Sequence, residues 1–289
     1  MQIRIKSTLV LYVTAILFLC SCGSKTNKEG RYIPANASFV LHMNGQSLNA
    51  KLPWEEIKQS ELFKQAYADS TIPVIMKSVL DNPENTGIDV KNDMLVFVIN
   101  DSSGGYIAIE GTVKDAAKFK QFSKNINETP SAESEKDGIH FLSNDNVTAS
   151  WKEEKFVMVM NAGDLNNPNK MKGLYADSSV MKPVIKKDLN AIATQIFNLK
   201  ESNSLGKEEK FTELMKTSGD LETLGLNNSD LPGMAALSMI NLKKIYEGSR
   251  VTGTVNFDNG KINVDFISYS GKEMTELMNK YSGESINSD

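Results

Sequence analysis

Both cysteines of this chain lie within its first 22 residues, and this feature most restricts how the chain can fold. The chain has 289 residues and 2 Cys, and Cys20 and Cys22 directly follow an apolar run from Leu9 to Leu19. From residue 23 onward, therefore, no disulfide and no cysteine–histidine zinc site can hold the fold together. The rest of the chain must be held by an apolar core, and it is long enough to bury one.

The first 22 residues have the order of a bacterial export signal. Arg4 and Lys6 give a positive start, and the apolar run that follows is shorter than the ~20 residues of a membrane-spanning helix. Leu19-Cys20-Ser21-Cys22 resembles the lipobox of lipoproteins, which has an aliphatic residue, a variable residue, a small residue and then an obligatory Cys. The resemblance implies cleavage between Ser21 and Cys22, and palmitate-type acylation of Cys22. An ordinary secretory signal with incidental cysteines is the alternative.

The composition separates the chain into segments with different properties. We expect a signal peptide at 1–21, a flexible polar tether at 22–31, a first unit at 32–163, a second unit at 170–282 and a disordered tail at 283–289. The formal net charge is −4, and loss of Arg4 and Lys6 with the signal would take it to −6. An acidic body of this kind lacks the basic surface of a nucleic-acid binder, so we expect no nucleic-acid partner.

Hydrophobic periodicity predicts alternating strands and helices in the first unit. Residues 94–99 are apolar at every position, which is typical of a strand covered on both faces. We interpret residues 128–138 as a polar mobile loop. The other predicted strands are 38–44, 106–110, 139–142, 147–152 and 155–160, and the predicted helices are 53–68, 72–80 and 115–126.

The second unit has a similar alternation. Asp258-Asn259-Gly260 between two alternating runs is a strong hairpin signal, and predicts paired strands at 251–257 and 261–269. Ser270 to Glu273 resembles a capping box that opens a final helix. Helices are also predicted at 181–199 and 211–217, and a strand at 234–240. The predicted class is α+β, with antiparallel sheets and helices packed on one face. Two divergent copies of one β-α-β-β-α type unit remain an open interpretation.

Three short motifs resemble a family of cell-envelope lipoproteins of Bacteroidota that is catalogued as a domain of unknown function. They are Tyr32-Ile-Pro-Ala-Asn-Ala-Ser-Phe-Val40, Asn82-Pro with Thr86-Gly-Ile-Asp-Val90, and Val251-Thr-Gly-Thr-Val-Asn-Phe-Asp-Asn-Gly-Lys261. The resemblance covers about residues 31 to 282 and implies an envelope location. It implies no activity and no site residues, because the family has none established.

The sequence carries no nucleophile elbow, P-loop or dinucleotide-binding glycine motif. His42 and His140 could act as general bases, but no partner nucleophile is identifiable, and we interpret both as packed side chains. Closely spaced carboxylates could hydrolyse glycans. The chain has three such groups, and we favour the interpretation that they are solvated surface: Glu55-Glu56, Glu133/Glu135/Asp137 and Glu153-Glu154. We therefore expect no catalytic residue and no enzyme activity.

Oxygen-rich turns and aromatic residues give weaker signals. Residues 81–87 and 161–169 lack the spacing of an EF-hand calcium loop, so we expect no metal and no cofactor. Trp54 and Trp151 could stack on sugars, but core packing is favoured. Asp69-Ser70-Thr71 resembles a short O-glycosylation acceptor, which makes Ser70 a candidate, and a helix-capping turn explains it equally well.

These observations predict a lipid-anchored protein of the cell envelope, most simply a non-catalytic binding or assembly module. Its expected partners are the membrane, through the N-terminal lipid, and other envelope proteins. We expect the outer membrane, with the periplasmic face favoured, because residues 23–28 carry no acidic cluster of the kind that accompanies surface export. The alternative is an envelope hydrolase that uses paired carboxylates, with glycans as a candidate substrate.

Overall fold

The computed structural model describes residues 30–69, 72, 74–100, 105–125, 130–161, 187–216, 219–226, 242–258 and 260–282. Predictions for Ser21, Cys22, Ser70, the strand at 234–240 and the tail at 283–289 lie outside these residues. Among the described residues, no helix is both long enough and apolar enough to cross a membrane.

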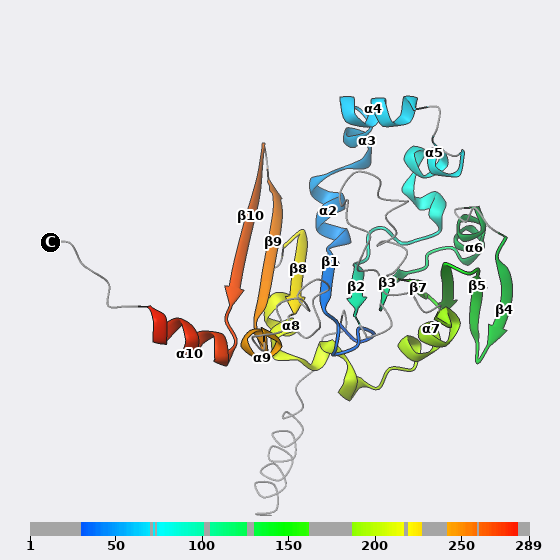
Figure 1. Ribbon diagram of the computed structural model, residues 1–289. Helices are drawn as coiled ribbons and strands as arrows, with labels where there is room; N and C mark the ends of the chain where they lie inside the picture. The colour runs from blue at the N-terminus through cyan, green and yellow to red at the C-terminus, as the bar shows by residue number, and fades with distance from the viewer. Residues whose placement is uncertain are drawn as a thin grey trace, which may run out of the picture.

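Within the described ranges, ten strands form one antiparallel sheet in the order β10-β9-β8-β1-β2-β3-β7-β6-β5-β4 (Figure 1). The strands are β1 Phe39–Met43, β2 Met94–Ile99, β3 Tyr106–Thr112, β4 Ala132–Lys136, β5 Ile139–Ser143, β6 Val147–Lys152, β7 Lys155–Asn161, β8 Leu221–Leu226, β9 Arg250–Asp258 and β10 Lys261–Tyr269. The α+β class is confirmed. β1 pairs with β2 on one side and with β8 on the other, so strands of both predicted units share the sheet. The division into two units stays a prediction.

The helices are short and lie around the sheet. Those in the first half are α2 Gly45–Lys51, α3 Trp54–Ile57, α4 Glu61–Ala68, α5 Val74–Asp81 and α6 Ala116–Asn125. Those in the second half are α7 Leu189–Phe197, α8 Glu209–Leu214, α9 Leu242–Tyr246 and α10 Lys272–Tyr281. Single turns of 3₁₀ helix occur at Pro83–Thr86, Glu201–Asn203 and Leu205–Lys207. α2 to α5 form a group at one end of the central strands (Figure 1).

Two apolar cores lie on opposite faces of the sheet, because alternate residues of a strand point to opposite faces. In β7, Val157 and Val159 belong to the larger core, under α7 and α8, whereas Phe156 and Met158 belong to the smaller core, under α6. Phe119 of α6 is fully buried and packs on Phe156. Helices therefore cover both faces, and our expectation of helices on one face was wrong in this respect, because a strand as apolar as β7 needs cover on both sides.

Several predicted elements differ from the observed ones. The predicted helix at 53–68 is two helices, α3 and α4. Residues 132–136, placed in a mobile loop, form the strand β4 paired with β5. β8 and α2 were not predicted. In β2, Leu95, Phe97 and Ile99 are buried, whereas the opposite face is only half-buried. The final helix begins after Gly271 without a side-chain cap, so the predicted capping box was wrong.

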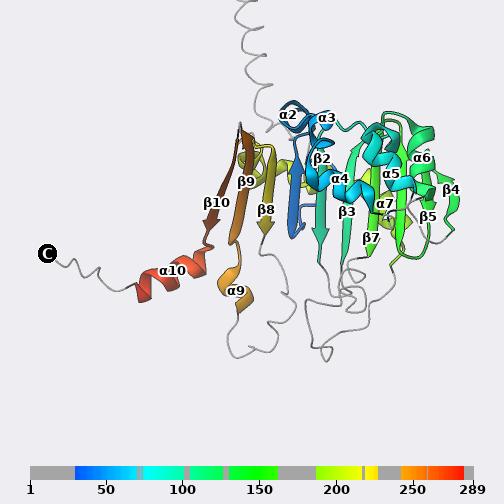
Figure 2. The same cartoon turned by 90° about the horizontal axis from the view of Figure 1, so that it is seen from above.

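The two edges of the sheet have different side chains. β4 is five residues long and reads AESEK, so it exposes mainly charged or small groups. β10 is nine residues long and exposes large apolar side chains. α10 follows β10 and projects beyond this edge, away from the body of the sheet (Figures 1 and 2).

Candidate functional site

Charged side chains gather at one end of the central strands. Because β1 runs antiparallel to both β2 and β8, the end of β1 lies beside the starts of β2 and β8. The Asn44 side chain, directly after β1, accepts a hydrogen bond from the backbone N–H of Ser47 and thereby caps α2. The cap places the first turns of α2 over the start of β8.

His42 is the centre of this cluster. It is 2% exposed and lies opposite Glu222 in the pairing of β1 with β8. Its Nδ1 is 2.9 Å from Oε2 of Glu222, and its Nε2 is 3.2 Å from Oδ2 of Asp93. The backbone N–H of Gly219 donates to the other oxygen of Glu222 at 2.8 Å. The imidazole thus lies between two carboxylates, one of them 1% exposed.

The carboxylates determine the charge state of His42. Burial alone lowers the pKa of an imidazole, because it disfavours the charged form. Here Asp93 and Glu222 outweigh burial and raise the pKa of His42 to about 9. At neutral pH the ring is therefore an imidazolium with a carboxylate at each nitrogen. It has no lone pair with which to accept a proton, so it is not a general base at neutral pH.

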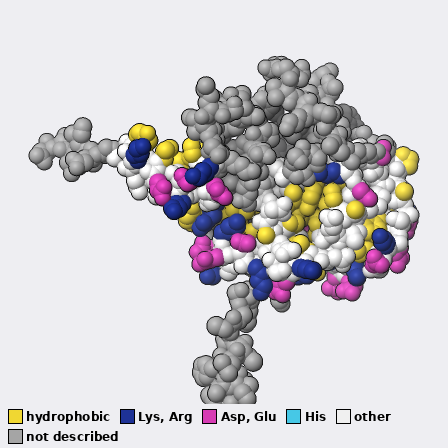
Figure 3. Space-filling view, turned by 60° about the horizontal axis from the view of Figure 1, so that its bottom comes forward, with side chains coloured by type: hydrophobic (Ala, Val, Ile, Leu, Met, Phe, Trp, Pro, Cys, Tyr) yellow, Lys and Arg dark blue, Asp and Glu magenta, His cyan; other side chains and the backbone are white. Residues whose placement is uncertain are grey.

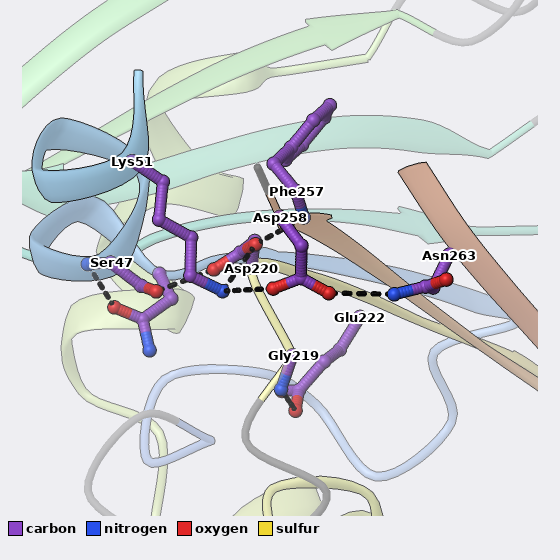
Figure 4. Close-up of polar contacts among 9 residues, drawn as sticks. Ser47, Lys51, Gly219, Asp220, Glu222, Phe257, Asp258 and Asn263 are labelled. Atoms are coloured by element: carbon purple, nitrogen blue, oxygen red, sulfur yellow. Dashed lines mark hydrogen bonds and ion pairs between the residues drawn. The ribbon is translucent and has the colours of Figure 1, made fainter. Parts of the chain in front are cut away.

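A second group of contacts surrounds Asp220, directly before β8 (Figure 4). Its carboxylate accepts hydrogen bonds from the Ser47 hydroxyl and the Phe257 backbone N–H, and Nζ of Lys51 is 2.9 Å from Oδ2. Although burial opposes it, these contacts lower the pKa of Asp220 below its ordinary value. Lys51 also lies 4.0 Å from Asp258, at the end of β9. The group thus connects α2, β8 and β9.

Elsewhere in the described part of the chain, two cavities lie away from this cluster. One of about 60 Å³ is lined by Glu213, Arg250, Asp265 and other residues of α8, β9 and β10. The other, of about 410 Å³, is lined by Tyr32, Thr112, Phe197, Asn198 and the turn at 152–155 between β6 and β7. Neither is lined by a residue of the His42 cluster.

A buried carboxyl lies beside the larger cavity. Glu110 of β3 is fully buried, and its only described charged contact is with Nζ of Lys155 at 3.1 Å. Burial raises the pKa of Glu110, although the Lys155 ammonium opposes the shift. Lys155 lines the cavity, and its ammonium lies 5.0 Å from the centre of the Tyr32 ring.

The candidate residues from the sequence are mostly structural. Trp151 is buried in the smaller core, and His140 stacks on it. Glu55 and Glu56 lie in the first turn of α3 and are exposed. Glu133 forms ion pairs with Lys120 and Lys124. In the turn at 81–87 the Asn82 side chain caps a 3₁₀ helix. Across the described part of the chain, no cluster of three or more His, Cys, Asp or Glu residues is placed to hold a metal.

The profile of a family described as "Domain of unknown function (DUF4836)" matches residues 30–287. The chain belongs to this family. The predicted resemblance to a domain of unknown function is thereby confirmed, and its lineage is not addressed by the match. No curated protein matches the chain.

Solved structures resemble the chain only distantly. Crystal form I of TP0453 has a TM-score of 0.43 and 9% identity, over 89% of this chain and 86% of that one. Crystal form III of TP0453 has a TM-score of 0.44 and 8% identity, over 89% and 88%. Identities this low say nothing about the function of this DUF4836 member.

Proposed function

We propose that the chain is a lipid-anchored binding or assembly module of the cell envelope and has no catalytic activity. The observation that carries the binding role is the edge of the sheet at β10, which no other strand of the described residues pairs beyond. Ile262, Val264 and Phe266 lie on one face of this strand and are 62%, 50% and 70% exposed. Natural proteins protect such edges with charges, as β4 does here, unless a partner covers them.

The His42 cluster supports the non-catalytic part of this proposal. Both ring nitrogens face carboxylates, and His42 and Glu222 are buried, so a substrate has no route to them. The charges are instead paired with one another, and removing one member of such a buried pair is strongly destabilising because it leaves the other charge uncompensated.

The binding role is tested by photo-crosslinking in cells. A photoreactive phenylalanine analogue is placed at Val264 of the full-length chain, and in a matched control at Ser134 of the β4 edge. We expect a protein adduct from position 264 and none from position 134. The absence of any adduct at 264, with the protein at normal abundance, would refute the binding role.

The anchor is tested separately. Cys22→Ala should abolish labelling by a palmitate analogue and release the protein from membranes, whereas Cys20→Ala should leave both unchanged. Retention and labelling of the Cys22→Ala protein would contradict lipidation there. Protection of the protein from external protease in intact cells would agree with the periplasmic face of the outer membrane.

The alternative function, glycan hydrolysis by paired carboxylates, has one observation in its favour. Glu153 and Glu154 line the larger cavity beside Tyr32 and Phe197, so carboxylates and aromatic rings share one hollow. Release of soluble fragments from purified cell-wall glycan, lost in Glu153→Gln with Glu154→Gln, would establish this alternative and overturn the non-catalytic proposal.

A further inference from the structure

The larger cavity lies on one face of the sheet, beside the larger core. Thr112 of β3 lies directly opposite Lys155 of β7 in the strand pairing, and both line the cavity. Tyr32 and Phe197 pack against the larger core and form an apolar wall, with their ring centres 6.5 Å apart and an interplanar angle of 67°. The volume of about 410 Å³ falls within the ~300–1,000 Å³ of sites that bind small molecules.

The polar wall of this cavity is held in place by contacts on its outer side. The backbone N–H of Val113 donates to the carbonyl of Glu154 at 2.6 Å, which connects the turn at 152–155 to the end of β3. The ammonium of Lys155 lies 3.1 Å from the carboxylate of Glu110, which is fully buried beneath it. A site whose groups are already fixed loses less freedom when a ligand binds.

The charges that line the cavity favour an uncharged ligand. Lys152 and Lys155 line it together with Glu153 and Glu154, which lie between them in the turn. An anion would meet both glutamates and would find Lys155 already paired with Glu110. A cation would meet the two lysines. On the described face drawn in Figure 3, Lys and Arg side chains are interspersed with Asp and Glu, so no large area of one sign draws in an ion.

The lining also has hydrogen-bonding groups that the protein does not use. Glu153 and Glu154 are exposed, and neither forms an ion pair with another described residue. Glu153 has a φ of +53°, a conformation that favours Gly, Asn or Asp, so the turn itself does not require a glutamate there. These carboxylates can only accept, whereas the amide of Asn198 and the hydroxyl of Thr112 can both donate and accept. An uncharged ligand that matches them must donate and accept at many positions.

We propose that this cavity binds a neutral oligosaccharide. Sugar hydroxyls donate to carboxylates such as Glu153 and Glu154 and accept from groups such as the Asn198 amide. The apolar C–H face of a sugar ring packs on aromatic side chains, here Tyr32 and Phe197. The sugar is bound without being cleaved, because both carboxylates lie in one turn, whereas those of a glycosidase flank the bond that breaks. This site is separate from the β10 edge and goes beyond its protein-binding role.

The experiment is isothermal titration calorimetry of the full-length protein in a polyoxyethylene detergent, which contains no sugar. The probes are neutral trisaccharides of glucose, mannose, galactose and N-acetylglucosamine. Inorganic phosphate and spermidine are the ionic controls. At least one trisaccharide should bind saturably, and neither ionic control should bind.

Two variants test whether the sugar lies in this cavity. Glu153→Ala with Glu154→Ala should weaken trisaccharide binding at least about tenfold, because hydrogen bonds to two charged groups are lost. Phe197→Leu keeps an apolar side chain but removes the ring, and should also weaken binding. The matched control, Glu55→Ala with Glu56→Ala, removes two neighbouring exposed glutamates from α3 and should bind as the unsubstituted protein does. Urea denaturation shows that each variant is folded.

The outcomes separate this inference from the proposed function. Absence of saturable binding for every trisaccharide overturns the inference, and so does binding of phosphate or spermidine alone. Trisaccharide binding that both cavity variants leave unchanged places the sugar elsewhere and also overturns it. Cleavage of the bound trisaccharide, detected by mass spectrometry, overturns both binding without cleavage and the non-catalytic proposal. The photo-crosslinked adduct at Val264 depends on none of these results, so failure of the β10 binding role is seen independently.

Discussion

Removing the positive charge of His42 should lower the free energy of unfolding. The pH range over which this stability is lost follows from the two carboxylates beside the ring. An imidazole has a pKa near 6.5 in an unfolded chain, and its two carboxylate neighbours raise that of His42 to about 9 in the folded one. A raised pKa means that folding favours the protonated ring. The stabilisation is complete below pH 6.5 and is lost as the pH rises through 9.

The size of the effect follows from the same shift. One pKa unit corresponds to 1.36 kcal/mol, so a shift from 6.5 to about 9 contributes about 3 kcal/mol to the free energy of unfolding. His42 is 2% exposed, so water does not screen its contacts. For a single domain this is a substantial part of the ~5–15 kcal/mol that separates folded from unfolded chains.

The assay is urea denaturation of the full-length protein in nonionic detergent from pH 6 to pH 9.5, followed by tryptophan fluorescence. His42→Gln keeps a polar side chain but cannot carry the charge. We expect it to be less stable than the unmodified protein by about 3 kcal/mol or more at pH 6, and the gap to narrow by about 3 kcal/mol by pH 9.5. His140→Gln, on a partly exposed side chain, is the matched control, because it removes an imidazole and leaves the contacts of His42 with Asp93 and Glu222 in place.

Nuclear magnetic resonance gives an independent measurement. The chain has 2 His, so the ring signals are assigned by their loss in the two glutamine variants. The His42 ring should still be protonated at pH 8. A His42 signal that titrates near 6.5, or stability curves of His42→Gln and the unmodified protein that stay parallel from pH 6 to pH 9.5, would refute the reasoning.

Three further substitutions test other parts of the structure by the same denaturation assay. Lys155→Met should destabilise the fold by up to about 3 kcal/mol at pH 8 and by less at pH 5, because it leaves the Glu110 carboxylate buried without its cation; adding Glu110→Gln should recover most of the loss. Asp220→Asn should cost about 2 kcal/mol at pH 7, since the hydrogen bonds and ion pair of this buried carboxylate depend on its charge, and the cost should shrink as the pH falls below 4. Gly87→Ala should cost more than about 1 kcal/mol, because Gly87 has a φ of +73° and an added Cβ would lie 2.3 Å from the Phe119 backbone nitrogen.

Each of these has an outcome that contradicts it. If the stability lost in Lys155→Met did not change with pH, the buried Glu110 carboxylate would not be the cause of the loss. An Asp220→Asn protein with unchanged stability would show that Lys51 and Ser47 are bound as well without the negative charge as with it. Gly87→Ala with wild-type stability would show that the turn after residue 86 relaxes freely.

Local patterns in the sequence were enough to predict much of the sheet. The run at 94–99 corresponds to β2, and the Asp-Asn-Gly signal corresponds to the β9–β10 hairpin. These predictions succeed because apolar alternation and turn residues act over a few neighbouring positions. β4 was missed because all five of its residues are exposed, so its sequence carries no alternation.

The candidate site could not be predicted in the same way. β8 presents Glu222, Leu224 and Leu226 to the buried side, and a charged residue at the first of these positions hides the apolar alternation. Burial of Glu222 is tolerated because His42, 180 residues earlier in the chain, lies opposite it. Neither residue signals the other in a single sequence. One pattern in the sequence points toward this pair. His42 shares a strand face with Val40, and if that face is buried, the polar ring on it needs a polar partner.

The same pair explains how strands distant in the sequence find one register. β1 and β8 are short, and their apolar residues alone would allow a shifted pairing. A slip of one residue would place His42 opposite Leu221 or Thr223 and turn the whole β8 side-chain pattern to the other face. Glu222 would then lie away from the imidazolium, so the buried ring would keep Asp93 but lose one of its two carboxylates, and breaking a buried ion pair costs several kcal/mol. The buried ions therefore select one register at the centre of the sheet, and through β8 they position β9 and the β10 edge on which the binding role depends.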